Sequence, residues 1–119
     1  MKRISVKEDV EELRSVWEQA RGLMFKRAEA NKVYLFQFQK KRSGSFHMFF
    51  VPKAIDIVFL DDGWVVVDLK KGFKPWTIYK PKREYSRVLE AKEGFIKKNN
   101  IRLGTIIRLP KLKSKLSDK

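Results

Sequence analysis

The chain has 119 residues, no cysteine and a formal net charge of +14, and 43% of its residues are hydrophobic. This composition indicates a folded domain with one core, excludes disulfides, thiolate metal sites and a cysteine nucleophile, and favours a reducing compartment, the cytoplasm. No apolar run approaches the roughly 20 residues that span a bilayer, and charged residues follow the first methionine too closely for a signal peptide, so we expect no membrane association.

The first predicted element is a helix from about Val6 to Arg21. Ser5 and Glu8 have the spacing of a capping box, and from Val10 onward apolar residues recur every three or four positions. Acids near the start would suit the positive end of the helix dipole, and Gly22 would end the helix.

Short segments rich in β-branched and aromatic residues follow, separated by turn residues. Asp61-Asp62-Gly63 predicts a hairpin turn in which the glycine adopts the left-handed conformation. Residues 72–81 are expected to be looser, and a short helix is expected at about Glu93–Asn99, with Asn100 or Gly104 as a turn residue. The predicted strands are Val33–Phe38, Phe46–Val51, Ile55–Leu60, Trp64–Leu69, Tyr85–Ala91 and Thr105–Leu109.

This pattern predicts a mostly β domain of the α+β type. We expect an antiparallel β-sandwich or a small barrel-like domain with an N-terminal helix and a short late helix. Residues 1–109 are expected to form a single globular domain. Residues 110–119 are rich in lysine and have little apolar periodicity, which predicts a disordered basic tail.

Seven short motifs, taken in their order and spacing, resemble family 192 of the domains of unknown function, a group of small bacterial and archaeal proteins. The resemblance covers about residues 13–109 and implies a mostly β, sandwich-like domain but no particular activity. The motifs are Arg21–Phe25, Leu35-Phe36 with Phe38, Phe46–Met48, Ile55–Phe59, Asp61–Val66, Val88–Glu90 with Gly94, and Ile101 with Gly104.

Three positions depart from the commonest pattern of that family. His47 stands where the pattern has tryptophan, Phe49-Phe50 where it has Lys-Asn, and Thr105 where an aspartate often stands. This variant resembles an archaeal-type branch. Because the asparagine is lost, a site built on the family's polar positions would not transfer directly to this chain.

Four polar residues inside the motifs form a candidate small-ligand site: Arg21, His47, Asp56 and Glu90. Asp56 interrupts an apolar strand and should be paired, with Arg21 as the expected partner, because an isolated buried charge is very costly. The alternative is a buried ion pair that stabilises the fold, and we favour it. The single histidine has apolar neighbours, which favours a core role over a general base.

No nucleotide-binding or nucleophile motif occurs, so we assign no catalytic residue and do not expect an enzyme. His47, Asp56, Asp68 and Glu90 lack the spacing of a known metal motif, and we expect neither a metal nor a cofactor.

The most suggestive segment is residues 70–87, where seven basic residues and one acid alternate with four aromatic rings. Cations that meet phosphates beside rings that stack on bases are the minimum equipment for binding single strands. The alternative is a solvated loop whose rings cover the core. The candidate nucleic-acid-binding residues are Lys70, Lys71, Lys74, Trp76, Tyr79, Lys80, Lys82, Arg83 and Arg87.

These features predict a non-enzymatic binding module for an anionic partner, with nucleic acid as the leading candidate. One alternative is a small-ligand or minor enzymatic site at the four polar residues, and another is an interaction domain for an acidic protein. A lysine-rich chain with three Asn and three Gln is also typical of heat-stable proteins, so the charge has a second explanation.

Overall fold

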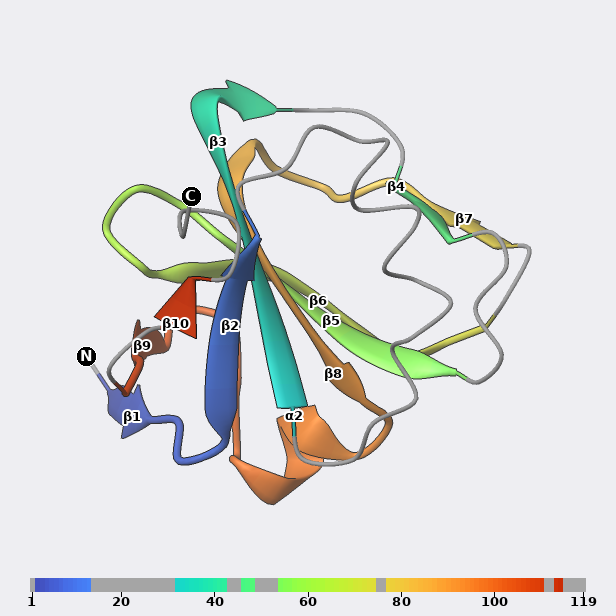
Figure 1. Ribbon diagram of the computed structural model, residues 1–119. Helices are drawn as coiled ribbons and strands as arrows, with labels where there is room; N and C mark the ends of the chain where they lie inside the picture. The colour runs from blue at the N-terminus through green and yellow to red at the C-terminus, as the bar shows by residue number, and fades with distance from the viewer. Residues whose placement is uncertain are drawn as a thin grey trace.

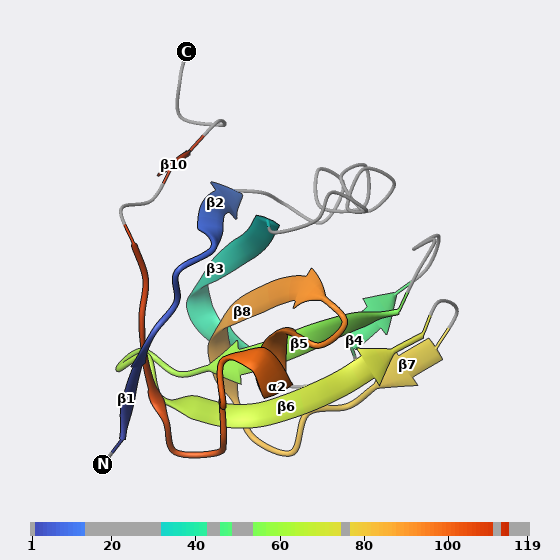
Figure 2. The ribbon, with the colours of Figure 1, turned by 90° about the horizontal axis from the view of Figure 1, so that it is seen from below.

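The computed structural model describes residues 2–13, 32–42, 46–48, 54–74, 77–110 and 113–114, and these are mostly β (Figure 1). The strands form a six-stranded sheet and two two-stranded sheets in a sandwich-like arrangement that is not closed into a barrel (Figure 2). The elements are β1 (Arg3–Ser5), β2 (Asp9–Leu13), β3 (Lys32–Arg42), β4 (Phe46–Met48), β5 (Ile55–Leu60), β6 (Val66–Phe73), β7 (Thr77–Tyr79), β8 (Tyr85–Lys92), α2 (Phe95–Lys98), β9 (Ile106–Arg108) and β10 (Lys113–Ser114).

The six-stranded sheet has the order β10-β2-β3-β8-β5-β6 and mixes strand directions. The pairs β3–β8, β8–β5 and β5–β6 are antiparallel, whereas β10–β2 and β2–β3 are parallel. The smaller sheets pair β1 with β9 in parallel and β4 with β7 antiparallel. The mostly β prediction is therefore confirmed, but the sheet is mixed rather than purely antiparallel.

The core lies on both faces of the six-stranded sheet, and β5 is its centre. Every residue of β5 is buried, which is why its sequence is apolar at successive positions rather than at alternate ones. Ile57 and Phe59 pack on one face with Tyr85, and Val58 and Leu60 pack on the other face. The second face also carries α2, through its buried Phe95 and Ile96.

The predicted N-terminal helix is wrong, because its described part consists of strand and connecting residues. Val6 donates its backbone N–H to the carbonyl of Arg108 at 2.8 Å, and β2 pairs with β3. Val6 and Val10 are both buried in the sheet core, and their four-residue spacing also fits a helix. Tertiary strand pairing thus outweighs a weak local helix preference. Residues 14–21 lie outside the described residues.

The predicted hairpin between β5 and β6 is confirmed, but the left-handed residue is Trp64 rather than Gly63. Asp61 Oδ1 accepts the N–H groups of Gly63 at 2.9 Å and Val65 at 3.0 Å. Trp64 has a φ of 64° and donates its N–H to the Asp61 carbonyl at 3.1 Å. A three-residue hairpin loop places its left-handed residue last, and that position is Trp64.

The later elements agree well with the predictions. β5, β8, α2 and β9 lie at the predicted positions, and Asn100 and Gly104 both adopt positive φ. β6 begins at Val66 and extends to Phe73, and β7 falls within the segment expected to be loose. In the predicted tail, Lys113–Ser114 pairs with β2, while residues 111–112 and 115–119 lie outside the described residues. Among the helical residues described, no stretch has the length and hydropathy to cross a membrane.

Candidate functional site

Asp56, the carboxylate that interrupts β5, is 2% exposed and is held by backbone amides. Its Oδ1 accepts the N–H of Gly72 at 2.9 Å, and its Oδ2 accepts the N–H groups of Gly94 at 3.1 Å and Ile96 at 2.9 Å. The side chain therefore links β6 and the start of α2 to the central strand. Asp56 is buried, and the partners described for it are backbone amides rather than the cation that the sequence led us to expect. The predicted pair with Arg21 stays a prediction because Arg21 lies outside the described residues.

Glu90 lies in β8, is 1% exposed, and faces the opposite side of the sheet from Asp56. Glu90 is directly opposite Ile57, whereas Asp56 is directly opposite Ala91. Residues directly opposite each other share a face, and successive residues alternate between faces. The structure therefore does not bring these two carboxylates together.

The side chains of the two remaining residues of the predicted ligand site lie outside the described part of the chain. His47 pairs through its backbone with Ile78, and its side chain, like Arg21, lies outside what is described. Within the described residues, no three of His, Asp and Glu gather in a way that could hold a metal ion. A ligand site at Arg21, His47, Asp56 and Glu90 stays a prediction.

Asp68 and Tyr79 anchor the segment predicted to bind nucleic acid. Asp68 is buried, and its Oδ2 accepts the Tyr79 hydroxyl and the Lys82 backbone N–H, both at 2.8 Å. The Tyr79 ring packs against Phe59 and Phe73, with centroids 5.9 and 6.5 Å apart. Burial, the hydrogen bond to Asp68 and the charge of Asp68 raise the pKa of Tyr79 to about 12. These contacts favour a core-covering role for this ring, and base stacking stays a prediction.

Arg87, another candidate in this segment, is held by the fold. Its Nε donates to Gln37 Oε1 and its Nη1 to the Asp61 carbonyl, both at 2.9 Å. The guanidinium also lies over the Trp64 ring, 4.3 Å from the centroid. Arg87 therefore stabilises the β5–β6 hairpin from β8, and its cation is less available to a partner than those of the exposed lysines.

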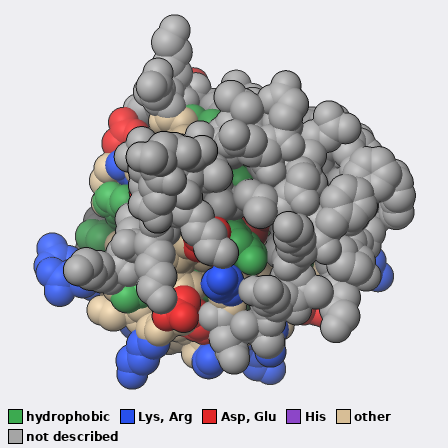
Figure 3. Space-filling model, viewed as in Figure 1, with side chains coloured by type: hydrophobic (Ala, Val, Ile, Leu, Met, Phe, Trp, Pro, Cys, Tyr) green, Lys and Arg blue, Asp and Glu red, His purple; other side chains and the backbone are tan. Residues whose placement is uncertain are grey.

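The other described cations of the segment differ in exposure. Lys70 is half-buried, with its Nζ 5.5 Å from the Tyr79 ring centroid, and Trp76 lies outside the described residues. On the face shown in Figure 3, the Lys and Arg side chains lie mainly toward the rim. Five exposed cations define what we call the cationic surface: Lys71, Lys74, Lys80, Lys82 and Arg83.

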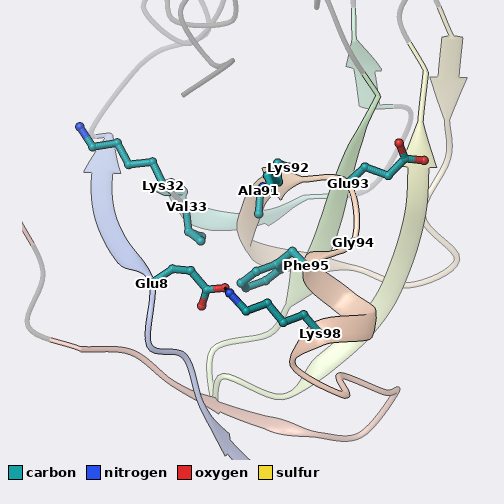
Figure 4. Close-up of a pocket in the computed structure, with 9 residues that line it drawn as sticks. All are labelled: Glu8, Lys32, Val33, Ala91, Lys92, Glu93, Gly94, Phe95 and Lys98. Carbon is teal, nitrogen blue, oxygen red and sulfur yellow. Dashed lines mark ion pairs between the residues drawn. The ribbon is translucent and has the colours of Figure 1, made fainter. Parts of the chain in front are cut away.

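The structure also contains a pocket that the sequence did not predict, of about 110 Å³, beside α2 (Figure 4). Glu8 and Lys98 form an ion pair at 3.4 Å at this pocket. The sequence pattern suggested a helix-capping role for Glu8 and placed Lys98 only within the range of the predicted short helix. No local motif could reveal the pocket, because its lining comes from three segments that lie far apart in the sequence: Glu8, Lys32-Val33 and residues 91–98.

The family comparison covers most of the chain. A sequence profile of the DUF192 family, described as Uncharacterized ACR, matches residues 2–109. A UPF0127 protein of Pyrococcus horikoshii is 36% identical over 77 residues, 65% of this chain and 66% of that protein. A UPF0127 protein of Pyrococcus furiosus is 32% identical over 83 residues, 70% of this chain and 71% of that protein. The match spans slightly less than two thirds of the first relative, and only 46% of a UPF0127 protein of Thermococcus sibiricus.

Two solved structures share the fold. One, from Sinorhizobium meliloti and described as a "putative transcription regulator", has a TM-score of 0.71 at 22% identity over 80% of this chain and 76% of that chain. The other, a protein of unknown function from Novosphingobium aromaticivorans, has a TM-score of 0.69 at 26% identity over 80% of this chain and 70% of that chain. The ordered motifs, the relatives and the profile match agree, and the chain belongs to the DUF192 family, in its archaeal-type branch.

Proposed function

We propose that this domain binds an anionic partner through the cationic surface, and that the partner is a single-stranded nucleic acid. The observation that supports the proposal is the separation of charge between the inside and the outside of the domain. Asp56, Asp68 and Glu90 are buried in the sheet, as is Glu11, whereas the five cations of the cationic surface are exposed. An anion that approaches this surface therefore meets more positive charge than the overall composition suggests.

The sequence around the cationic surface strengthens this local excess. Residues 70–84 contain six basic residues and one acid, Glu84. Phosphate groups of a nucleic acid backbone are attracted to such a surface because their binding releases condensed counterions.

The backbone that carries these cations is attached to the core. Asp68 accepts the Tyr79 hydroxyl and the Lys82 N–H, so the chain is held at Tyr79 and Lys82, which are next to Lys80 and Arg83. An already ordered segment loses less conformational entropy on binding than a free loop does. This anchoring supports a surface that presents Lys80, Lys82 and Arg83 in a defined arrangement.

The expected recognition is of the backbone rather than of bases. Lysine and arginine contacts to phosphates position a nucleic acid but do not read its sequence. Two competing explanations are an acidic protein partner and a role of the lysines in heat stability alone. The experiment below separates them.

The test compares two triple variants with equal changes in charge by fluorescence anisotropy on a single-stranded RNA and a single-stranded DNA. The first replaces Lys80, Lys82 and Arg83 with Gln. The control replaces the exposed Lys2, Arg3 and Lys7 with Gln, around β1, which lies across the molecule from β7 (Figures 1 and 2). We expect the first variant to bind about tenfold more weakly or worse, since each lost phosphate contact removes counterion release. We expect the control to change affinity by less than about twofold.

Three outcomes would overturn the proposal. Equal losses in both variants would indicate general attraction of polyanions, as would equal binding of heparin and the oligonucleotides. Absence of binding to either oligonucleotide, together with salt-sensitive binding to poly-glutamate, would favour an acidic protein partner instead.

A further inference from the structure

The pocket beside α2 is distinct from the cationic surface and has the features of a small-molecule site. It lies between Glu8, the start of β3, the end of β8 and α2 (Figure 4). Val33, Ala91 and Phe95 form apolar walls, and charged side chains complete the lining. Its volume of about 110 Å³ is smaller than the roughly 150 Å³ of an engineered cavity that binds benzene. A ligand of at most about six non-hydrogen atoms is therefore expected.

Glu8 supplies the observation that points to a ligand. Its side chain is 9% exposed, and its Oε2 meets Lys98 Nζ at 3.4 Å and Asn99 Nδ2 at 3.3 Å. Its Oε1 is buried and has no hydrogen-bond partner among the described residues. A buried carboxylate oxygen without a donor is costly, so a bound group with an O–H or N–H would stabilise it.

Asp56 shows what a carboxylate with only a structural role looks like in the same region. Both of its oxygens accept backbone N–H groups, and those donors include Gly94 and Ile96 at the start of α2. Those two amides already have an acceptor. No described residue supplies a corresponding donor to Glu8 Oε1.

The charges around the pocket narrow the ligand class further. Lys32, Lys92 and Lys98 line the pocket, and Lys32 is paired with Glu11 at 3.3 Å. Lys98 is 68% exposed, so its ammonium can also meet an incoming acid. The net charge of +14 disfavours an additional bound cation. A neutral hydroxyl is thus a better donor to Glu8 than an ammonium, and an acidic group on the same ligand would face the lysines.

We propose that this pocket binds a small hydroxycarboxylate. Its hydroxyl group donates to Glu8 Oε1, its carboxylate lies against the Lys98 ammonium, and its carbon atoms contact Phe95 and Val33.

The test uses three molecules of matched size: lactate, propionate, which lacks the hydroxyl, and 1,2-propanediol, which lacks the carboxylate. Each is titrated into the ¹⁵N-labelled protein while backbone amide shifts are followed. We expect lactate to move the amides of Val33, Ala91 and Phe95. We also expect it to bind about tenfold more tightly than either analogue, the effect of losing one hydrogen bond to a charged group.

Three variants test whether lactate binds in this pocket. Glu8→Ala should reduce lactate binding to the level of propionate, whereas Glu84→Ala should leave it unchanged. Glu84 is an acid of the same charge that is exposed and does not line the pocket. Lys98→Met keeps the apolar stem and should abolish the preference for lactate over 1,2-propanediol.

The proposal is overturned if the three molecules bind equally, if lactate binding survives Glu8→Ala, or if no amide around the pocket shifts. The last result would mean that water alone occupies the pocket. Thermal unfolding of each variant, compared with the unchanged protein, separates loss of binding from loss of folding. Should Glu8→Ala unfold, the lactate preference in Lys98→Met decides the question.

Discussion

The buried carboxylates of the six-stranded sheet and the exposed cations of the β6–β8 connection show two uses of charge in one domain. Asp56 and Asp68 are 2% and 6% exposed, and both oxygens of each accept hydrogen bonds from the fold. Lys80, Lys82 and Arg83 face solvent. Asp68 connects the two regions, because it holds the backbone that displays those cations. The acids stabilise structure, and the cations remain available to a partner.

The largest expected effect is the loss of stability when a buried carboxylate is removed. Asp56→Ala should lower the free energy of unfolding by about 3–5 kcal/mol, since it leaves the buried N–H groups of Gly72, Gly94 and Ile96 without their acceptor. Chemical denaturation would measure the change. Asp56→Asn is the control and should cost less, because the amide keeps one accepting oxygen. A loss below about 1 kcal/mol for Asp56→Ala would show that these amides find other partners.

A smaller loss of stability is expected when Asp68, which connects the sheet to the segment with the exposed cations, is changed. Asp68→Ala should cost about 1–3 kcal/mol, because it removes Oδ2, which accepts both the Tyr79 hydroxyl and the Lys82 N–H. Amide hydrogen exchange should also become faster at Lys82. If exchange at Lys82 stayed as slow as in the unchanged protein, Asp68 would not be the anchor of this segment.

The pH dependence of stability offers a finer test of the same link. The pKa of Tyr79 is raised from 10.0 to about 12, so its neutral form is favoured in the folded state. The resulting stabilisation is fully present below pH 10 and is lost as the pH rises through about 12. Tyrosinate absorbance should show this late ionisation, and Tyr79→Phe should remove it. Ionisation of Tyr79 near pH 10 would argue against its burial beside Asp68.

The fold was predictable from the sequence where the local pattern of apolar residues matches the burial of the strand. The run Ile55–Leu60, apolar apart from Asp56, matches β5 residue for residue, because a central strand covered on both faces is apolar at successive positions. The N-terminal segment misled because its apolar residues have helical spacing from Val10 onward, whereas Val6 and Val10 are buried with residues from strands that come much later in the chain, such as β9. The position of Trp64 in the left-handed conformation depends on the loop length, which the motif alone did not settle.

The sites were predictable only in part, for a related reason. The charged Asp56 within an apolar strand correctly indicated a buried residue with partners. Its partners Gly94 and Ile96 lie 38 and 40 residues away, so their identity depends on where α2 packs. The Glu8 pocket combines residues from both ends of the described chain, and no spacing rule brings Glu8 to Lys98.

The most direct test of the proposed function is the salt dependence of binding to a single-stranded oligonucleotide. We would measure the association constant over a range of salt concentrations for the unchanged protein and for the variant with Lys80, Lys82 and Arg83 replaced by Gln. Three lost phosphate contacts should reduce the magnitude of the log–log salt slope by about 2, at about 0.7 for each contact. An unchanged slope would contradict the proposal, because these exposed cations would then not contact the phosphates.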